Sequence, residues 1–281
     1  MIQRNRDLRF SPSPLSLRLF ITIAMALALL APVNFVLITP GPATALFPKV
    51  LSVEAPAGVK TYPVNGQLNL LTIYVTNPES YVFGAEVLGC WAWGECVALP
   101  RSVMYEDGAT DDAEVKTGKK EMTQSQNTAL AAARGAINRN FKSVDISAVQ
   151  DKSVKISLKN TGGPSGGLIF TLGLIDLLTS EDLLQGRNIA GTGTISADGK
   201  VGPIGGVAEK VIGAKKAGAK ILFISTQNCS ELPSKVEGIE VIAIEKIDEA
   251  ISYLRQPFSR GERGEGNFNS AGIRGCASVG A

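Results

Sequence analysis

The most restrictive feature of this sequence is an uncharged apolar run near its N-terminus, from Leu19 to Ile38. As one helix, these twenty residues would match the roughly 30 Å hydrocarbon thickness of a bilayer. The segment before the run is basic, with four arginines against the single acid Asp7: Arg4, Arg6, Arg9 and Arg18. The positive-inside rule then keeps segment 1–18 in the cytoplasm and puts the chain beyond Thr39 outside. We therefore predict a single-pass signal-anchor helix over 19–38.

A cleaved signal peptide is the alternative, because Ala43-Thr44-Ala45 offers small residues at a cleavage site. The apolar run is longer than the 7–15 residues typical of a secretory signal, which favours a retained anchor. On either interpretation the remainder of the chain is exported. Export favours a disulfide between Cys90 and Cys96, which flank a short loop, although two buried free thiols are the alternative.

The chain contains no histidine, the usual proton shuttle of hydrolases. Any chemistry must therefore proceed without imidazole. No CxxC pair is present, so we predict neither a structural metal nor a cofactor. The net charge of +2 and the lack of a basic stripe argue against nucleic acid as a partner. Cys276 lies in a Gly-, Ser- and Arg-rich tail, where we expect it to be exposed.

Composition and periodicity predict an α+β fold beyond the apolar run. Segment 39–120 is interpreted as a juxtamembrane linker followed by a small β-rich module, with a strand over 68–75. An alanine-rich helix is expected over 122–137, and the tail 257–281 is expected to be disordered. After residue 147, short β-like runs alternate with helical runs. The expected strands are 154–158, 189–195, 221–225 and 241–244, and the expected helices are 166–178, 207–217 and 247–254.

Ser165 stands in the segment Gly163-Pro164-Ser165-Gly166-Gly167, between a predicted strand and an apolar helix. A serine on such a turn presents its hydroxyl on a sharp bend. The backbone N–H groups around Gly163, Pro164 and Gly166, at the helix start, can stabilise an oxyanion. The segment also matches the nucleophile elbow of α/β-hydrolases, but that fold needs a histidine. A glycine-rich turn with Ser165 as helix N-cap is the non-catalytic alternative.

Without histidine, a neutral lysine can activate a serine, because burial lowers the pKa of the amine. No serine here has the S-x-x-K spacing of β-lactamases. Three segments nevertheless resemble the proteolytic domain of the Lon peptidase family in order and spacing: TGGPSGG (161–167), IAGTGTI (189–195) and DGKVGPIGGVAEK (198–210). The resemblance implies that Ser165 is the nucleophile, that Lys210 is its base, and that Thr192 orients Lys210 by a hydrogen bond. The alternative for Lys210 is a solvated lysine in a first helical turn.

The resemblance is specific over about 149–250, and we assign the Lon-like domain to 121–256. One departure is Gly162, where many Lon domains carry an acid three positions before the serine. Membrane-anchored Lon-like bacterial peptidases commonly carry a PDZ module before the catalytic segment, but only about ten residues (138–148) are available for it here. No GxxxxGK[ST] phosphate loop is present either.

The resemblance thus implies an ATP-independent serine endopeptidase that cleaves exposed or flexible polypeptide segments outside the cytoplasmic membrane. Polypeptide substrates and the membrane are the expected partners. The rings that Lon domains often form suggest a homo-oligomer by analogy. The alternative is a catalytically silent Lon-like protein that binds peptides or acts as a scaffold at the membrane.

Overall fold

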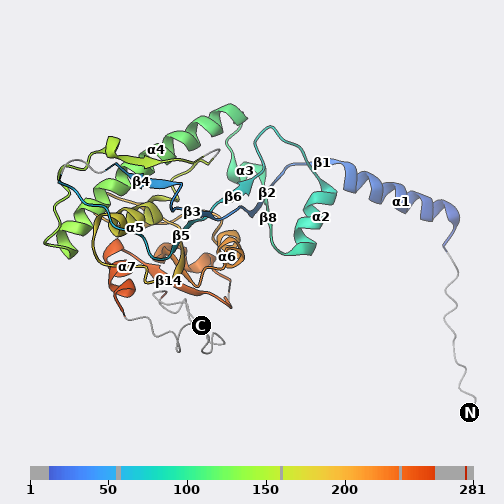
Figure 1. The fold of residues 1–281 in the computed structure, drawn as a ribbon. Coiled ribbons are helices and arrows are strands. Elements are labelled where there is room, and N and C mark those ends of the chain that lie inside the picture. Colours follow the sequence, from blue (N-terminus) through green and yellow to red (C-terminus); the bar gives the residue numbers. More distant parts are fainter. Residues whose placement is uncertain (1–12, 55–57, 159–160, 234–235, 257–275, 277–281) are drawn as a thin grey trace, which may run out of the picture.

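The computed structural model describes residues 13–54, 58–158, 161–233, 236–256 and 276, and it has a mixed α+β architecture (Figure 1). A five-stranded sheet forms its centre, with the strand order β14-β13-β10-β5-β3. The first four of these strands are parallel, and only β3 runs antiparallel, against β5. Their bounds are β3 Thr44–Ala45, β5 Gln67–Leu70, β10 Asn188–Gly191, β13 Ile221–Ser225 and β14 Glu240–Ile244.

Both faces of this sheet are covered, as is usual for parallel strands. Alternate side chains of β13 show the division, because successive residues point to opposite faces. Ile221 and Phe223 enter a large apolar cluster with helices α4, α5 and α7, whereas Leu222 and Ile224 enter a smaller one with α6. The helix bounds are α4 Asp111–Asn140, α5 Gly167–Leu178, α6 Val207–Lys216 and α7 Ile247–Leu254. Helix α5, which follows Ser165, and helix α6, which contains Lys210, are thus both held by the core.

A second, antiparallel sheet lies between the central body and the N-terminal helix, with the strand order β6-β2-β8. Its strands are β2 Phe35–Pro40, β6 Ile73–Val75 and β8 Val97–Pro100, and helices α2 (Gly84–Trp93) and α3 (Arg101–Met104) pack beside it. Three two-stranded pairs complete the sheet structure of the described residues: β1 (Pro32–Val33) with β7 (Val82–Phe83), β4 (Leu51–Val53) with β9 (Val154–Ile156), and β11 (Thr194–Ile195) with β12 (Val201–Gly202). Two 3-10 turns cover Asp151–Ser153 and Thr226–Glu231.

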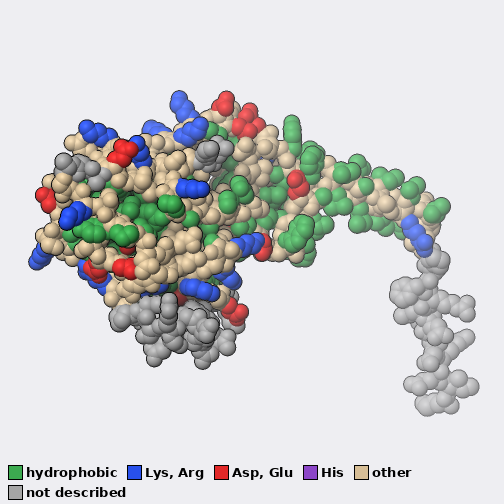
Figure 2. Space-filling view, in the orientation of Figure 1, with side chains coloured by type: hydrophobic (Ala, Val, Ile, Leu, Met, Phe, Trp, Pro, Cys, Tyr) green, Lys and Arg blue, Asp and Glu red, His purple; other side chains and the backbone are tan. Residues whose placement is uncertain are grey.

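Helix α1 (Leu15–Leu30) projects from the body, and none of its residues is buried (Figure 1). In the space-filling view, hydrophobic side chains run along its whole length (Figure 2). The predicted helix over 19–38 is wrong in extent, because α1 ends before Pro32. Proline lacks a backbone N–H and disfavours helical torsion angles in the residue before it, and Ala31 is accordingly extended.

The end of the apolar run reaches the protein interior at alternate residues. Val36 is fully buried and Ile38 is 6% exposed, both in β2, which pairs with β6 and β8. Within the described part of the chain, no helix has both the length and the apolar character needed to cross a bilayer.

Other differences from the sequence prediction concern segment 39–120. The single strand predicted over 68–75 is two strands, β5 in the central sheet and β6 in the second sheet. The predicted juxtamembrane linker contains β3, and the predicted helix over 122–137 is the longer α4, capped by the Thr110 hydroxyl. The predicted domain boundary at 121 therefore falls inside a helix, and the central sheet draws two strands from before it. The tail predicted to be disordered lies outside the described residues apart from Cys276.

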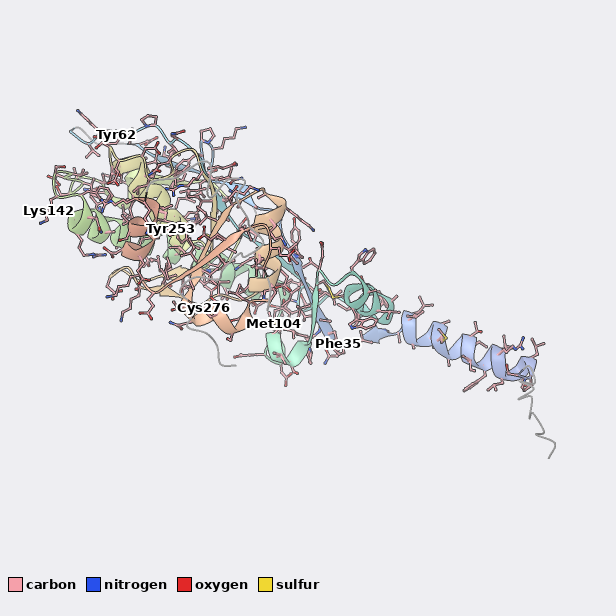
Figure 3. All side chains as sticks on the ribbon, turned by 90° about the horizontal axis from the view of Figure 1, so that it is seen from below. Phe35, Tyr62, Met104, Lys142, Tyr253 and Cys276 are labelled. Atoms are coloured by element: carbon pink, nitrogen blue, oxygen red, sulfur yellow. A yellow bond between two sulfur atoms is a disulfide. The ribbon has the colours of Figure 1, made fainter. Side chains whose placement is uncertain are left out.

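All four cysteines form disulfides, Cys90 with Cys96 and Cys229 with Cys276. The first bond is one of the two alternatives left open by the sequence. The second was not foreseen, since Cys276 was expected to be exposed. It instead packs in part against the smaller apolar cluster, next to the body of the protein (Figure 3).

Candidate active site

Ser165 lies on the turn immediately before α5. The turn needs a left-handed residue at Gly163, whose φ is +89°, a conformation that glycine adopts without steric cost. Ser165 itself is half-buried, and the N-cap of α5 is Gly166, with no side-chain cap. Ser165 is therefore not the helix N-cap that the non-catalytic interpretation assumed.

Several hydrogen bonds from two sides of the core hold the Ser165 turn. On one side, the Gly163 N–H donates to the Gly118 carbonyl at 2.9 Å, and the Ser125 hydroxyl donates to the Pro164 carbonyl at 3.0 Å. Both Gly118 and Ser125 belong to α4. On the other side, the Ser165 carbonyl accepts the Gly193 N–H at 2.9 Å. The backbone on both sides of Ser165 is thus fixed.

Lys210 lies in the first turn of α6 and is only 3% exposed. Its position follows from the helical period, since Val207, Val211 and Ala214 occupy the same buried face. Burial lowers the pKa of Lys210 to about 8, although the carboxylates of Glu209 and Glu231 act in the opposite direction. A solvated first-turn lysine is excluded by this burial. With this pKa, about a tenth of the amine is neutral at pH 7 and about half near pH 8, and the neutral form is the one that a general base requires.

Ser165 and Lys210 line the same cavity, which has a volume of about 710 Å³. Its wall combines the glycine-rich turn with apolar residues of the second sheet and with Met122 of α4. The remaining lining residues are Pro42, Leu70, Leu71, Thr72, Ile73, Tyr74, Val75, Met104, Glu121, Thr161, Gly162, Gly163, Pro164 and Gly205. Segments from residue 42 to residue 210 therefore meet at one place, and the two residues of the predicted dyad meet there.

Thr192 has a different contact from the one implied by the family resemblance. Its side chain is fully buried, and its hydroxyl donates to the Ser165 carbonyl at 3.4 Å. Within the part of the chain that the structure describes, no hydrogen bond joins Thr192 to Lys210. In this structure Thr192 supports the nucleophile turn instead of orienting the base.

Fewer backbone N–H groups are available as oxyanion donors than the sequence suggested. The Gly163 N–H is engaged by Gly118, and Pro164 has no N–H to offer. Among the described residues, the N–H groups of Ser165 and Gly166 donate to no acceptor. These two groups remain the backbone candidates for an oxyanion site.

The departure at Gly162 has a steric explanation in this fold. A Cβ added to Gly162 would lie 3.0 Å from the carbonyl carbon and 3.1 Å from the Cα of Gly118. Such contacts are tight, so a side chain at this position would require the backbone of α4 or of the turn to shift by a few tenths of an ångström. The close approach also allows the hydrogen bond from Gly163 to Gly118.

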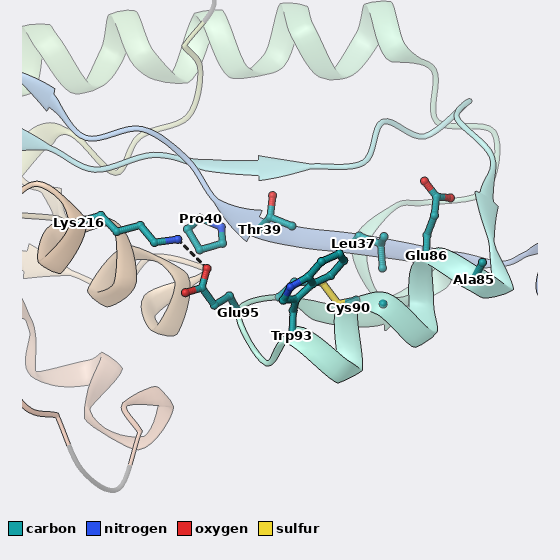
Figure 4. A pocket seen from close by; sticks show the side chains of 11 residues that line it. Leu37, Thr39, Pro40, Ala85, Glu86, Cys90, Trp93, Glu95 and Lys216 are labelled. Carbon is teal, nitrogen blue, oxygen red and sulfur yellow. Dashed lines mark hydrogen bonds and ion pairs between the residues drawn. A yellow bond between two sulfur atoms is a disulfide. The ribbon is translucent and has the colours of Figure 1, made fainter.

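A second cavity of about 680 Å³ lies between α2 and β2, away from the dyad (Figure 4). Trp93 and the Cys90–Cys96 disulfide line it, and the ion pair of Lys216 with Glu95 stands at its edge. No polar group capable of acid–base catalysis comparable to Lys210 is buried there. In the described ranges, no group of three or more His, Cys, Asp or Glu side chains is placed to hold a metal ion.

The fold and this cavity agree with what sequence comparison finds. The family model of the Lon protease (S16) C-terminal proteolytic domain matches residues 110–256, slightly more than half of the chain. The chain belongs to this family and carries a Lon-type serine peptidase domain.

Individual relatives match over shorter stretches. Lon protease 2 of Herpetosiphon aurantiacus is 31% identical over 182 residues, which is 60% of this chain and 21% of that protein. Lon protease 2 of Bacillus subtilis is 35% identical over 92 residues, 33% of this chain and 16% of that protein. The mitochondrial Lon protease homolog of Candida albicans is 40% identical over 106 residues, 36% of this chain and 10% of that protein. The chain thus spans about a fifth or less of the length of these relatives.

Proposed function

We propose that this protein is a serine endopeptidase in which Ser165 is the nucleophile and Lys210 is the general base. The observation that carries the proposal is the cavity that both Ser165 and Lys210 line. The burial that lowers the pKa of Lys210 to about 8 supports it further. A hydroxyl group and an amine of near-neutral pKa are the two groups that acyl transfer needs when no histidine is present.

The reaction proceeds in two acyl-transfer steps. The neutral Lys210 amine takes the proton of the Ser165 hydroxyl as the oxygen attacks the scissile carbonyl. Lys210 then gives this proton to the leaving amine, and an acyl-enzyme remains on Ser165. A water molecule, deprotonated by Lys210, attacks the ester; Lys210 returns this proton to the departing Ser165 oxygen, and the second product is released. The N–H groups of Ser165 and Gly166 stabilise the oxyanion in both steps.

The substrates are exposed or flexible segments of polypeptides, cleaved without ATP. A cavity walled by backbone and by apolar side chains such as Ile73, Val75 and Met122 suits an extended segment with apolar residues. The sequence contains no phosphate-loop motif that would couple cleavage to nucleotide hydrolysis. Addition of ATP and Mg²⁺ to the purified protein is therefore expected to leave the cleavage rate of an unstructured peptide unchanged.

The proposal extends to location, with the catalytic domain outside the cytoplasmic membrane and held there by the N-terminal segment. The support is the row of exposed apolar side chains on α1 from residue 19 to residue 28, preceded by arginine-rich sequence. Protease added to intact spheroplasts should digest the catalytic domain. Protection of the domain until the membrane is lysed would contradict this location.

The catalytic assignment is tested by hydrolysis of an internally quenched, unstructured peptide by four proteins: the wild type, Ser165→Ala, Lys210→Ala and Lys215→Ala. Lys215 is a matched control because it is exposed on the same helix as Lys210. We expect hydrolysis by the wild type and by Lys215→Ala, and loss of at least about a thousandfold in the other two. Normal hydrolysis by either dyad variant would show the assignment to be wrong.

The same assay decides the alternative of a silent peptide-binding protein. That hypothesis predicts no hydrolysis by the wild type but retained binding of the peptide, measured by fluorescence anisotropy. No observation on the described residues favours it over catalysis.

A further inference from the structure

Helix α4 makes direct contact with the nucleophile turn at two positions separated by seven residues. Gly118 accepts the Gly163 N–H through its carbonyl, and Ser125 donates its hydroxyl to the Pro164 carbonyl. Residues seven apart lie on the same face of an α-helix, two turns from each other. One face of α4 therefore contacts the two residues that immediately precede Ser165.

The Ser125 hydroxyl contacts the nucleophile turn, so its role is not limited to the packing of α4. Its side chain is 5% exposed, and the hydrogen bond runs to a carbonyl 39 positions away in the sequence. Two other hydroxyl groups of α4, those of Thr123 and Thr128, donate within their own helix, to the carbonyls of Lys119 and Gln124. A buried hydroxyl that leaves its helix to bind the turn is thus distinct among these three.

The Pro164 carbonyl and the Ser165 N–H belong to one peptide unit. In a planar trans peptide the C=O and N–H bonds point in opposite directions. When Ser125 holds the carbonyl toward α4, the Ser165 N–H must point away from α4. That N–H has no acceptor among the described residues, and Ser165 lines the cavity together with Lys210.

We propose that Ser125 is a positioning residue that fixes the Pro164–Ser165 peptide plane and so holds the Ser165 N–H in the orientation of an oxyanion donor. The inference rests on the proposed serine peptidase function and adds a residue that the family motifs do not contain. The glycines Gly118 and Gly162 favour the arrangement, because their backbones approach so closely that a Cβ at Gly162 would lie 3.0 Å from the Gly118 carbonyl carbon. Thr192 and Gly193 hold the following carbonyl, that of Ser165, from the opposite side.

The loss expected from Ser125→Ala lies in the turnover step. Removal of a whole oxyanion donor costs about 10²–10³ in kcat. Ser125→Ala keeps the donor but loosens its orientation, because the Pro164 carbonyl then keeps only the longer bond from the Gly167 N–H, at 3.4 Å. We therefore expect kcat to fall by about 10- to 100-fold. KM should stay within about twofold, since the substrate ground state does not need the oxyanion donor. The midpoint of the pH–rate profile should not move, because Lys210 is untouched.

The experiment compares peptide hydrolysis and thermal unfolding for the wild type, Ser125→Ala, Ser125→Thr and Thr128→Ala. Thr128→Ala removes an α4 hydroxyl that bonds only within the helix, and it should retain kcat within about twofold. Ser125→Thr restores the hydroxyl and should recover most of the lost rate. If its added methyl group prevents folding, Ser125→Ala by itself tests the positioning role, through a lower kcat with an unchanged KM.

An unchanged kcat in Ser125→Ala, or a rise in KM with kcat intact, would overturn the positioning role while leaving the Ser165–Lys210 assignment in place. A shifted pH midpoint would overturn it as well, since Ser125 would then act through the base. An inactive wild type would instead remove the proposed function itself, and the positioning role with it.

Discussion

Two apolar helices of this protein have similar composition and opposite surroundings. Helix α5 buries every residue except Leu177, between α4 and the central sheet. Helix α1 buries none of its residues. Hydrophobicity alone therefore does not tell which helix belongs to the core. The difference follows from the neighbouring strands. Helix α5 is flanked by β9, which pairs with β4, and by β10 of the central sheet. Helix α1 is attached only at its C-terminal end, where β1 pairs with β7 and the Gly84 N–H donates to the Ala31 carbonyl.

The sharpest test of this comparison replaces one phenylalanine in each helix. Phe170 of α5 is fully buried, and Phe20 of α1 is 69% exposed. Phe170→Ala should lower the free energy of unfolding by about 3–5 kcal/mol, since it leaves a cavity in the core. Phe20→Ala should change it by less than about 0.5 kcal/mol. Urea unfolding followed by circular dichroism measures both, and equal losses would mean that α1 is packed in solution.

Charges allow the same comparison within one helix, since Lys210 is buried and Lys215 is exposed. The fall in the pKa of Lys210 from 10.5 to about 8 corresponds to about 3 kcal/mol of unfavourable burial of the charge. Below pH 8 the folded and unfolded chains both carry the proton, and this penalty is complete. Between about pH 8 and 10.5 only the unfolded chain keeps the proton, so stability rises with pH until the penalty is gone.

Lys210→Met should therefore stabilise the fold by up to about 3 kcal/mol at pH 7, and the gain should fade as the pH rises toward 10.5. Lys215→Met should show no such dependence. The measurement is urea unfolding of the three proteins between pH 7 and 10.5. A gain in Lys210→Met that stays constant over this range would mean that the lysine side chain is simply a poor fit.

Substitution of apolar residues on α1 tests its proposed contact with lipid. Ile23 and Leu27 are 51% and 66% exposed on this helix. Ile23→Glu and Leu27→Glu should each weaken binding to phosphatidylglycerol-containing vesicles at least tenfold, about 1.4 kcal/mol, as measured by flotation. Peptide hydrolysis in solution should not change, because α1 is remote from the cavity. Undiminished vesicle binding would show that another surface holds the membrane.

The smallest effect is expected for the surface ion pair that joins α6 of the central body to the loop after α2, beside the second sheet. Lys216 of α6 bonds Glu95, in the loop after α2, at 2.6 Å, and both side chains are more than half exposed. Water screens such a pair, so Glu95→Gln should cost only about 0.2–1 kcal/mol. Glu106→Gln is the control, because Glu106 is exposed and its side chain bonds no other described residue. A loss above about 2 kcal/mol would mean that this contact holds the second sheet to the body.

The sequence predicted several buried elements of the Lon-type domain well, although the single strand expected over 189–195 is divided into β10 and β11. The bounds of β13 and α7 agree with the predicted ranges 221–225 and 247–254, and α5 differs by one residue. These elements are dense apolar runs between glycine or polar residues, where local pattern and burial agree. The prediction of one helix over 19–38 was wrong because residues of the same apolar composition form two structures, a helix before Pro32 and a partly buried strand after it.

The site was predicted in part for a similar reason. Ser165 and Lys210 stand in segments with a family signature, and both line the cavity. Ser125 and Gly118 were missed because α4 has no comparable signature, and their contacts with the turn depend on how the helix packs. The bond between Cys229 and Cys276 was missed likewise, since it spans 47 positions and no local spacing indicates it.

The central claim is that Lys210 serves as the base for Ser165, and its most direct test is the pH dependence of kcat/KM on an unstructured peptide. The wild type should gain activity with rising pH, with a midpoint near 8, as the Lys210 amine loses its proton. Lys210→Arg should hydrolyse nothing at any pH between 6 and 10, because the guanidinium group keeps its proton. Hydrolysis by Lys210→Arg at the wild-type rate, or a wild-type profile that is flat through pH 8, would contradict the claim.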